Sequence, residues 1–282
     1  MELKELATDA ANTWCPGCGN FAILTAFKSV LKSLVEEGAP VENFVMVAGI
    51  GCHAKIADYV NINSFYSIHG RVAPVAQGIK IANPGLKVVG FAGDGDAYGE
   101  GLEHLLFAAK RNVDFTMFIH NNRVYGLTTG QYTPTSPLGF KGRSTPRGTV
   151  ESPVNPLELL LAAGAGFVGR AYSGRLDALK AIMKQAIQHP GFAVVDVLQV
   201  CATFFNVYDY YNQKVYELKD HDPTDFERAC ALAREWDYSS DAPIALGTFF
   251  RRETPRFEES FDRSELSETE RSERLKRMLE PR

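Results

Sequence analysis

The sequence predicts an α/β protein of the doubly wound class, built on a mainly parallel sheet. Short apolar runs alternate with segments in which apolar residues recur at helical spacing, as in strands joined by helices. Two of these runs, residues 86–92 and 115–120, are separated by a stretch long enough for one helix. Such a strand–helix–strand unit is the right-handed crossover of a parallel sheet. The 282 residues, 45% of them hydrophobic, suffice for a large buried core.

The first elements follow in order from the N-terminus. Residues 20–36 carry apolar side chains at helical spacing, and Gly38 and Pro40 then end the helix. The apolar run 44–48 predicts a buried strand. After strand 86–92, the sequence Gly-Asp-Gly-Asp precedes a helix. The expected core face of that helix consists of Leu102, Leu105, Leu106 and Ala109.

The second half of the chain predicts a further set of alternating elements. Its expected helices span residues 157–163 and 176–189, and its expected strands span residues 167–171 and 192–200. The stretch from Arg123 to Pro156 is rich in Gly, Thr, Ser and Pro, and loops of this length are usually functional or disordered. We expect one α/β domain at residues 1–215. A helical extension at residues 216–282 is expected to pack on the domain or on a partner subunit.

The overall charge argues against two classes of partner. A net charge of -4 and a pI near 5.9 leave no broad cationic surface for nucleic acid or for an anionic membrane. The N-terminal segment is charged where a signal peptide would be apolar. The longest apolar run, residues 159–168, is about half of the roughly 20 residues that a membrane span requires. A cytoplasmic location is expected.

The first candidate site combines an aspartate, an amide and glycines. Asp94, flanked by Gly93 and Gly95, and the pair Asn121 and Asn122 each follow a predicted strand. In a parallel sheet both motifs face the crevice at the carboxyl ends of the strands. A magnesium–diphosphate ligand requires hard oxygen donors and close backbone N–H groups, which these residues supply. A Gly-Asp-Gly alone is more often a tight turn, and the double asparagine is what favours a cofactor site.

The second candidate site consists of cysteines. Cys15 and Cys18 form a CxxC motif before the first helix, whereas Cys52 and Cys201 each follow a predicted strand. All four can meet near the same crevice. A CxxC motif alone is compatible with structural zinc, an iron–sulfur cluster or a redox dithiol, and single cysteines are often inert. Cys230, within a helical stretch, is interpreted as inert.

Seven segments together resemble a known family. They are Trp-Cys-Pro-Gly-Cys-Gly at 14–19, Gly-Cys-His-Ala-Lys-Ile at 51–56, His-Gly-Arg at 69–71, Ala-Asn-Pro at 82–84, Gly-Asp-Gly-Asp at 93–96, Asn-Asn-Arg-Val-Tyr-Gly-Leu-Thr at 121–128 and Asp-Val-Leu-Gln-Val-Cys at 196–201. The set spans residues 12–206 and resembles the beta subunit of the two-subunit 2-oxoacid:ferredoxin oxidoreductases. The resemblance implies the diphosphate-binding domain of thiamine enzymes.

The resemblance implies a thiamine diphosphate site with Mg²⁺. In the family pattern, the aspartate, the second asparagine and a carbonyl two residues later hold the metal, which here are Asp94, Asn122 and the carbonyl of Val124. Contacts to thiamine diphosphate are expected from Ile50, Gly51, Cys52, His53, Gly93, Gly95, Asp96, Gly126 and Leu127.

The resemblance also implies cluster ligands and catalytic residues. Cys15, Cys18, Cys52 and Cys201 correspond to the ligands of a 4Fe-4S cluster. Lys55 resembles a lysine that lies near substrate, although a surface lysine is the simpler interpretation. His69 and Arg71 match the family's His-Gly-Arg element, and Arg71 suits either a bidentate phosphate or carboxylate contact or a structural salt bridge.

Two positions depart from the family pattern. Thr129 stands where the family often has a lysine, so a cationic contact to substrate or coenzyme A from that position is lost. Val200 stands where the family often has a proline before the fourth cysteine, which does not affect ligation.

The activity implied is oxidative decarboxylation of a 2-oxoacid with coenzyme A to an acyl-CoA and carbon dioxide, with electrons passing through the cluster to ferredoxin. Because no second α/β domain fits in this length, an alpha subunit is expected to supply the carboxylate near the aminopyrimidine, in an alpha2beta2 assembly. 2-Oxoglutarate is favoured over pyruvate. Its distal carboxylate requires a cation, for which the candidates are alpha-subunit residues or Arg123, Lys141, Arg143 and Arg147.

Two alternatives remain at this point. One is a thiamine-dependent decarboxylase or synthase without redox chemistry, which would need the acid–amide motif but not the four cysteines. The other is a metal-binding electron-transfer module without thiamine, in which Gly-Asp-Gly is only a turn.

Overall fold

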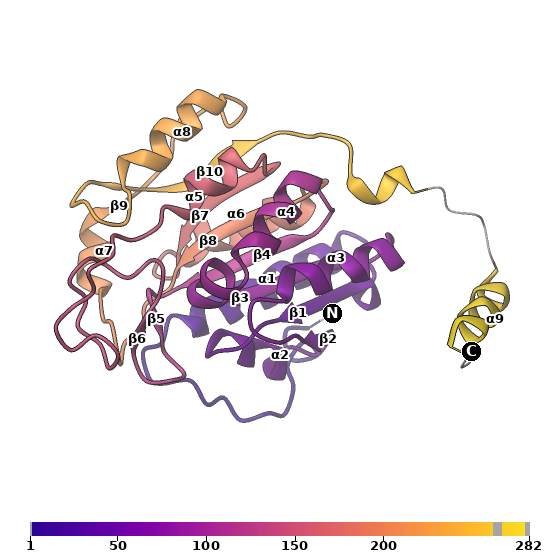
Figure 1. The fold of residues 1–282 in the computed structure, drawn as a ribbon. Coiled ribbons are helices and arrows are strands. Elements are labelled where there is room, and N and C mark those ends of the chain that lie inside the picture. Colours follow the sequence, from indigo (N-terminus) through magenta and orange to yellow (C-terminus); the bar gives the residue numbers. More distant parts are fainter. Residues whose placement is uncertain (1, 262–266, 280–282) are drawn as a thin grey trace.

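The computed structural model describes residues 2–261 and 267–279, and its main feature is an eight-stranded sheet (Figure 1). The strands are β1 (Phe44–Ala48), β2 (Asn63–Tyr66), β3 (Lys87–Gly93), β4 (Thr116–Asn121), β7 (Phe167–Tyr172), β8 (Ala193–Leu198), β9 (Val215–Glu217) and β10 (Ile244–Arg251). Their order in the sheet is β2-β1-β3-β4-β8-β7-β10-β9. β10 pairs antiparallel with β7, and the other neighbours are parallel. The predicted α/β class with a mainly parallel sheet is therefore confirmed.

Helices cover both faces of this sheet. They are α1 (Asn20–Glu36), α2 (Ile56–Tyr59), α3 (Val72–Ala82), α4 (Leu102–Arg111), α5 (Pro156–Ala162), α6 (Leu176–Gln188), α7 (Tyr208–Lys214), α8 (Phe226–Glu235) and α9 (Glu268–Leu279). α1 and α6 contribute to the core on one face, whereas α3, α4, α5 and α8 contribute to the core on the other. Every residue of β4, β7 and β8 is buried, as in strands that are covered on both sides.

The predicted elements match the structure closely in the first two thirds of the chain. The expected helix at 20–36 and strand at 44–48 have the bounds of α1 and β1. The α-helix expected after Gly-Asp-Gly-Asp does not begin directly at the end of β3. Residues 95–100 first form a π-helical turn, and α4 begins at Leu102. As a result Leu105 and Ala109 are buried, whereas Leu102 and Leu106 are only half-buried.

Two elements of the sheet region lacked the expected sequence signal. All four residues of β2 are exposed at the edge of the sheet, so the strand has no apolar run. α3 buries polar as well as apolar side chains, and Pro74 and Gly78 weaken its helical pattern. Its buried residues are Val72, Ala73, Ala76, Gln77 and Lys80.

The segment 216–282, for which a helical extension is expected, contains a strand as well as helices. β10 lies within that segment and extends the main sheet, pairing with β7 on one side and β9 on the other. A bulge between Thr248 and Phe250 and a positive φ of 129° at Gly247 interrupt the regular alternation by which a strand is recognised. The segment also contains α8 and α9, and residues 262–266 and 280–282 of it lie outside the described residues.

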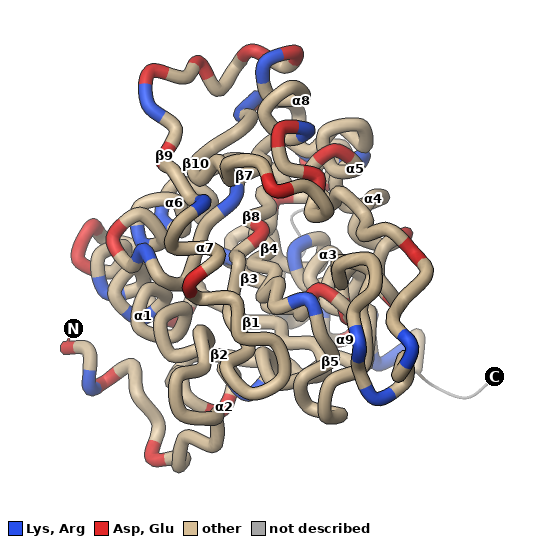
Figure 2. Tube along the Cα trace, turned by 90° about the vertical axis from the view of Figure 1, so that its left-hand side faces the viewer, with Lys and Arg blue, Asp and Glu red and all other residues tan. Residues whose placement is uncertain are grey.

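Charged residues of both signs are distributed over the same segments of the molecule. Figure 2 shows Lys and Arg residues interspersed with Asp and Glu residues along the outer segments. Within residues 2–261 and 267–279, no helix is both long and apolar enough to cross a bilayer.

Two residues of opposite charge, Arg170 and Asp196, are buried in the middle of the sheet without a hydrogen bond between them. Arg170 on β7 stands opposite Asp196 on β8, and both side chains are almost fully buried. The guanidinium lies over the rings of Trp236 and Tyr238, with its carbon 5.0 Å from each ring centroid. Burial raises the pKa of the Asp196 carboxyl, and the charge of Arg170 opposes this rise. Arg170 therefore connects the segment that contains Trp236 and Tyr238 to the central strands of the sheet.

Arg170→Met is expected to lower the free energy of unfolding by about 3–5 kcal/mol, because it leaves the Asp196 carboxylate buried without its counter-charge. Urea denaturation measures the change. Arg234→Met, which removes the exposed partner of Glu158, is the control and should change stability little. Equal losses of unfolding free energy in the two variants would show that buried Arg170 stabilises the fold no more than the exposed Arg234 does.

Candidate active site

Two adjoining cavities lie at the carboxyl ends of β1, β3, β4 and β8. The first, here called the acid–amide cavity, contains both predicted metal ligands, Asp94 and Asn122. The second, the cysteine cavity, contains the four predicted cluster ligands. The two cavities share Cys52, Asn122, Gly126 and Leu127 as a common wall. The two constellations predicted from the sequence are therefore adjacent in space.

Most of the predicted thiamine and magnesium residues converge on the acid–amide cavity. Its lining includes Ile50, Gly51, Cys52, His53, His69, Gly93, Asp94, Gly95, Asn122, Val124, Gly126 and Leu127. Gly95 allows the walls to approach closely, because a Cβ there would lie 2.2 Å from the ring of Tyr125. The lining is thus rich in backbone groups that can approach a phosphate.

Asp94 lies directly after β3, and only 1% of its surface is exposed. Burial raises the pKa of its carboxyl to about 6, although hydrogen bonds from Thr133 and Thr135 oppose the rise. The hydroxyl of Thr135 donates to Asp94 Oδ2 at 2.8 Å. A buried carboxylate of this kind is suited to a divalent cation, whose charge offsets the cost of desolvation.

Asn122 is held at both ends of its carboxamide. Its Nδ2 donates to Gln199 Oε1 at 2.8 Å, and its Oδ1 accepts from the backbone N–H of Val124 at 3.1 Å. Arg123 between them has a φ of 64°, in the left-handed region, so the chain turns sharply here. The turn places Asn122 and Val124 on the same cavity, as a shared metal site requires.

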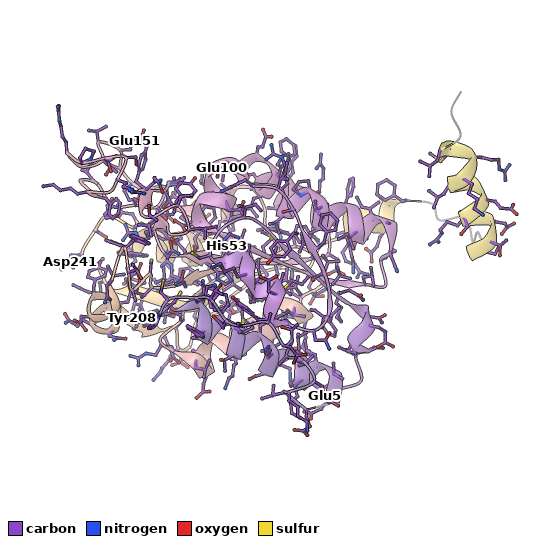
Figure 3. The ribbon with its side chains drawn as sticks, turned by 90° about the horizontal axis from the view of Figure 1, so that it is seen from below. Glu5, His53, Glu100, Glu151, Tyr208 and Asp241 are labelled. Carbon is purple, nitrogen blue, oxygen red and sulfur yellow. The ribbon has the colours of Figure 1, made fainter. Side chains whose placement is uncertain are left out.

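Two histidines that line the acid–amide cavity both contact the carboxylate of Asp96. Asp96 Oδ2 lies 3.2 Å from His53 Nε2, and Asp96 Oδ1 lies 3.1 Å from His69 Nδ1. Figure 3 shows His53 inside the body of the molecule and Glu100 above it in this view. Glu100 also contacts the second histidine, with its Oε2 3.2 Å from His69 Nδ1. Asp96 does not line the cavity itself. Its carboxylate contacts both rings at ion-pair distance without forming hydrogen bonds to them.

The four predicted cluster cysteines all line the cysteine cavity. A Cβ placed on Gly126 would lie 3.6 Å from Cys52 Sγ and 3.8 Å from Cys201 Sγ, so both sulfurs flank this glycine. Burial, and to a smaller extent the three other thiols, raises the pKa of Cys18 to about 12. The backbone N–H of Asn20 opposes this rise. Cys230 lies on α8 and packs against the hydrophobic core, away from this cavity.

The spacing of the thiols bears on the kind of metal centre. In the part of the chain that the structure describes, no three His, Cys, Asp or Glu side chains are close enough to hold one metal ion in common. Four thiols nevertheless line one cavity, with Gly126 beside two of them, and they can supply the ligands of an iron–sulfur cluster.

The three predicted catalytic residues occupy different places. His69 lines the acid–amide cavity, and Lys55 lines the cysteine cavity, where its Nζ donates to Thr13 Oγ1 at 3.0 Å. Arg71 is outside the lining of both cavities, and its Nη1 donates to the carbonyl oxygen of Glu100 at 3.1 Å. A direct contact from Arg71 to substrate or cofactor stays a prediction.

The basic residues of the long loop also separate. Arg123 is 4% exposed, and its Nε donates to the carbonyl oxygen of Thr135 at 2.6 Å, so it stabilises the loop. Arg143 is exposed and donates to Thr129 Oγ1 at 2.5 Å, and Thr129 lines the cysteine cavity. Lys141 and Arg147 are exposed residues that line neither cavity.

Three residues of the site were not found from the sequence. Thr135 lies in a loop without periodicity, so nothing indicated that it would reach Asp94. Asn121 was noted only as the first half of the double asparagine. Gln199 lies two residues before Cys201, and its polar side chain at the end of an apolar strand was a usable signal.

Asp94→Asn is expected to abolish the stabilisation by Mg²⁺ and thiamine diphosphate together, because the amide cannot supply the negative charge. At a ligand concentration about 100 times the dissociation constant, the unaltered chain should gain about 2.7 kcal/mol. Thermal unfolding with and without the two ligands measures this. Asp177→Asn, at an exposed position on α6, is the control. An Asp94→Asn chain that is stabilised as strongly as the control would exclude this metal site.

Comparison with known proteins assigns two parts of the chain to known families. Residues 49–197 match the family model "Thiamine pyrophosphate enzyme, C-terminal TPP binding domain". Residues 201–265 match the family model for the C-terminal part of the beta subunit of pyruvate ferredoxin oxidoreductase. The boundary between the two matches falls immediately before Cys201.

Similar proteins have consistent names. 2-Oxoacid:ferredoxin oxidoreductase 1, subunit beta, of Aeropyrum pernix is 42% identical over 251 residues, which are 85% of this chain and 78% of that protein. The 2-oxoglutarate synthase subunit KorB of Methanothermobacter thermautotrophicus is 36% identical over 242 residues, 86% of this chain and 83% of that protein.

A solved structure agrees with both. The 2-oxoglutarate:ferredoxin oxidoreductase from Magnetococcus marinus, with 2-oxoglutarate, coenzyme A and succinyl-CoA bound, superimposes with a TM-score of 0.86 at 32% identity. The match covers 99% of this chain and 91% of that one. The chain therefore belongs to the beta subunits of the 2-oxoacid:ferredoxin oxidoreductases, a family of multi-subunit oxidoreductases, and it contains their thiamine pyrophosphate-binding domain.

Proposed function

We propose that this beta subunit takes part in the oxidative decarboxylation of a 2-oxoacid with coenzyme A to an acyl-CoA and carbon dioxide, with electrons passing through a 4Fe-4S cluster to ferredoxin. The observation that carries this proposal is the wall shared by the acid–amide and cysteine cavities. Decarboxylation of a 2-oxoacid leaves an electron pair that must be removed. A redox centre behind the same wall suits that task, whereas a thiamine enzyme without redox chemistry has no use for it.

The acid–amide cavity fits the diphosphate and Mg²⁺ of thiamine diphosphate. Asp94, Asn122 and the carbonyl oxygen of Val124 would hold the metal, and the backbone near Gly95 and Gly126 would approach the phosphates. When bound, thiamine diphosphate supplies the electron sink for decarboxylation. The protein contributes position and charge, because Thr135 fixes Asp94 and the Val124 N–H fixes Asn122.

The four cysteines fit an iron–sulfur cluster, which supplies one-electron transfer when bound. Cys15 and Cys18 lie in one turn, where the N–H of Cys18 donates to the carbonyl oxygen of Cys15 at 3.1 Å. The indole of Trp14 donates to the carbonyl oxygen of Cys52 at 2.6 Å and so ties this turn to the third cysteine. The N–H of Gly19 donates to Val200 and ties it to the segment before the fourth.

The histidine pair and Lys55 are the groups of this chain nearest to the reacting atoms in our proposal. Asp96 holds the rings of His53 and His69 at the cavity wall. Lys55 presents its amine on the cysteine-cavity side of the shared wall. His69 and Lys55 would therefore contact substrate from opposite sides, with Asp96 as a positioning residue.

The site is proposed to be completed by an alpha subunit in an alpha2beta2 assembly. Ile50 and Leu127 line the acid–amide cavity, and their exposed fractions are 40% and 48%. Exposed apolar side chains beside a cofactor cavity are typical of a surface that a partner covers. The alpha subunit would bring the carboxylate that thiamine activation requires.

The preferred substrate is proposed to be 2-oxoglutarate rather than pyruvate. Arg143 is bonded to Thr129 on the cysteine cavity, and Thr129 occupies the position at which the family often has a lysine. The guanidinium therefore brings positive charge to the place where the side chain of residue 129 has none, where it can meet a distal carboxylate.

Cys201→Ala in the complete alpha–beta complex, purified without oxygen, is expected to lose the cluster and ferredoxin reduction while retaining thiamine diphosphate and Mg²⁺. Iron, sulfide and thiamine analyses together measure this. Cys230→Ala should keep all three at the unaltered level, since that thiol lies on α8 and packs against the hydrophobic core. Full iron content in the Cys201→Ala complex would contradict the proposed ligand set.

Arg143→Met is expected to reduce kcat/KM for 2-oxoglutarate by about tenfold to a hundredfold, because a charge-assisted hydrogen bond is lost, and to affect pyruvate little. Steady-state assays with both acids measure the ratio. Arg147→Met in the same exposed loop is the matched control. Preference of the unaltered complex for pyruvate, or equal effects of the two variants, would overturn the substrate assignment.

A further inference from the structure

We propose that the side-chain amide of Gln199 couples the two cofactor sites. Its Nε2 group sets the electronic environment of Cys18, and its Oε1 atom fixes the orientation of Asn122. The inference rests on the proposed function, since it needs a cluster on Cys18 and a metal on Asn122. It assigns to Gln199 the role of a positioning residue that acts through a ligand of each centre.

Gln199 spans the distance between the two predicted ligands directly. Its Nε2 lies 3.5 Å from Cys18 Sγ, and its Oε1 accepts from Asn122 Nδ2 at 2.8 Å. One planar group thus touches a ligand of the cluster and a ligand of the magnesium ion. This makes Gln199 a single-residue bridge between the two sites.

The position of this amide is firmly fixed. Gln199 is 1% exposed and directly follows β8, where its backbone N–H donates to the carbonyl oxygen of Asn121 at 3.0 Å. The second hydrogen of Nε2 is directed to the carbonyl oxygen of Val200 at 2.6 Å. With all its polar groups engaged, the side chain cannot rotate without losing buried hydrogen bonds.

The cysteine turn packs against the same segment. A Cβ on Gly19 would lie 2.9 Å from Val200 N and 3.0 Å from Gln199 Cγ, so only glycine allows this approach. Gly19 N–H donates to the carbonyl oxygen of Val200 at 3.0 Å. Cys18 is therefore held against Gln199 by the backbone on both sides of the contact.

The donor end of the amide bears on the cluster. Reduction adds negative charge to a cluster and its sulfur ligands, and an N–H group directed at a sulfur stabilises that charge. Cys18 receives such a group from Gln199 in addition to the backbone N–H of Asn20. Loss of the Gln199 donor should therefore make the cluster harder to reduce.

The acceptor end bears on the magnesium site. Gln199 Oε1 accepts from Asn122 Nδ2 while the Val124 N–H donates to Asn122 Oδ1, so the carboxamide is oriented from both ends and its oxygen keeps one lone pair for a cation. Without this acceptor, only the Val124 N–H distinguishes the oxygen of the Asn122 amide from its nitrogen. Residues that orient a metal ligand in this way typically contribute about 10- to 100-fold to metal affinity.

The test compares Gln199→Glu with Gln199→Met in the complete complex. Gln199→Glu has the same shape and still accepts from Asn122, but it replaces the donor toward Cys18 by an oxygen. Gln199→Met removes both donor and acceptor at similar length. Gln185→Glu, on the exposed side of α6 where a carboxylate still accepts from Thr248, is the matched control.

Two quantities are measured on anaerobic complex: the midpoint potential of the cluster by redox titration with electron paramagnetic resonance, and the dissociation constant of Mg²⁺ in the presence of thiamine diphosphate. Both Gln199 variants should shift the potential to more negative values. Only Gln199→Met should weaken Mg²⁺ binding, by about tenfold or more. Should the methionine variant not assemble, the isosteric glutamate variant and its control still decide the potential.

The failures are distinguishable. An unaltered complex without an iron–sulfur signal would overturn both the proposed function and this inference. A normal cluster in the unaltered complex, with a midpoint potential that neither Gln199 variant changes, would overturn the inference alone. Equal weakening of Mg²⁺ binding in the glutamate and methionine variants would overturn the role of the acceptor atom.

Discussion

The carboxyl edge of the parallel sheet is the constraint on which the site depends. β1, β3, β4 and β8 end side by side, and a polar or sulfur-bearing residue lies shortly after the end of each. Asp94 follows β3, Asn122 follows β4, and Cys201 lies just beyond β8. Because the strands are hydrogen-bonded to one another in fixed register, these side chains have little freedom to separate. Two cofactor sites can therefore share one wall without a flexible element between them.

A buried line of hydrogen bonds supports this edge from inside the sheet. The hydroxyl of Thr135 lies 2.8 Å from Asp94 Oδ2 and 2.9 Å from Asn121 Oδ1. Asn121 Nδ2 in turn donates to Asp196 Oδ1 at 3.0 Å, and Asp196 stands opposite Arg170. Hydrogen bonds thus connect the proposed metal ligand to the buried Asp196, which lies beside the charge of Arg170. Stability of the sheet and geometry of the site share these residues, so damage to one is expected to reach the other.

The sequence identified those parts of the site that immediately follow apolar runs. Asp94, Asn122, Cys52 and Cys201 could be found because a run of buried residues marks the strand, and topology then places its end in the crevice. Thr135 reaches Asp94 through an irregular loop, whose path depends on tertiary contacts that carry no periodic signal. Asp96, which was expected to contact the cofactor, contacts His53 and His69 in the structure and is absent from the cavity lining, so its contact to the cofactor stays a prediction. β10 was missed because its bulge removes the alternation that marks a strand.

The central claim is that one iron–sulfur cluster lies between the four cysteines, directly behind the wall of the diphosphate cavity. Anomalous diffraction at the iron absorption edge, on anaerobic crystals of the complete complex, tests it most directly. The account predicts a single strong iron peak per beta subunit, enclosed by Cys15, Cys18, Cys52 and Cys201. A peak at the zinc edge instead, or an iron peak elsewhere in this subunit, would contradict it.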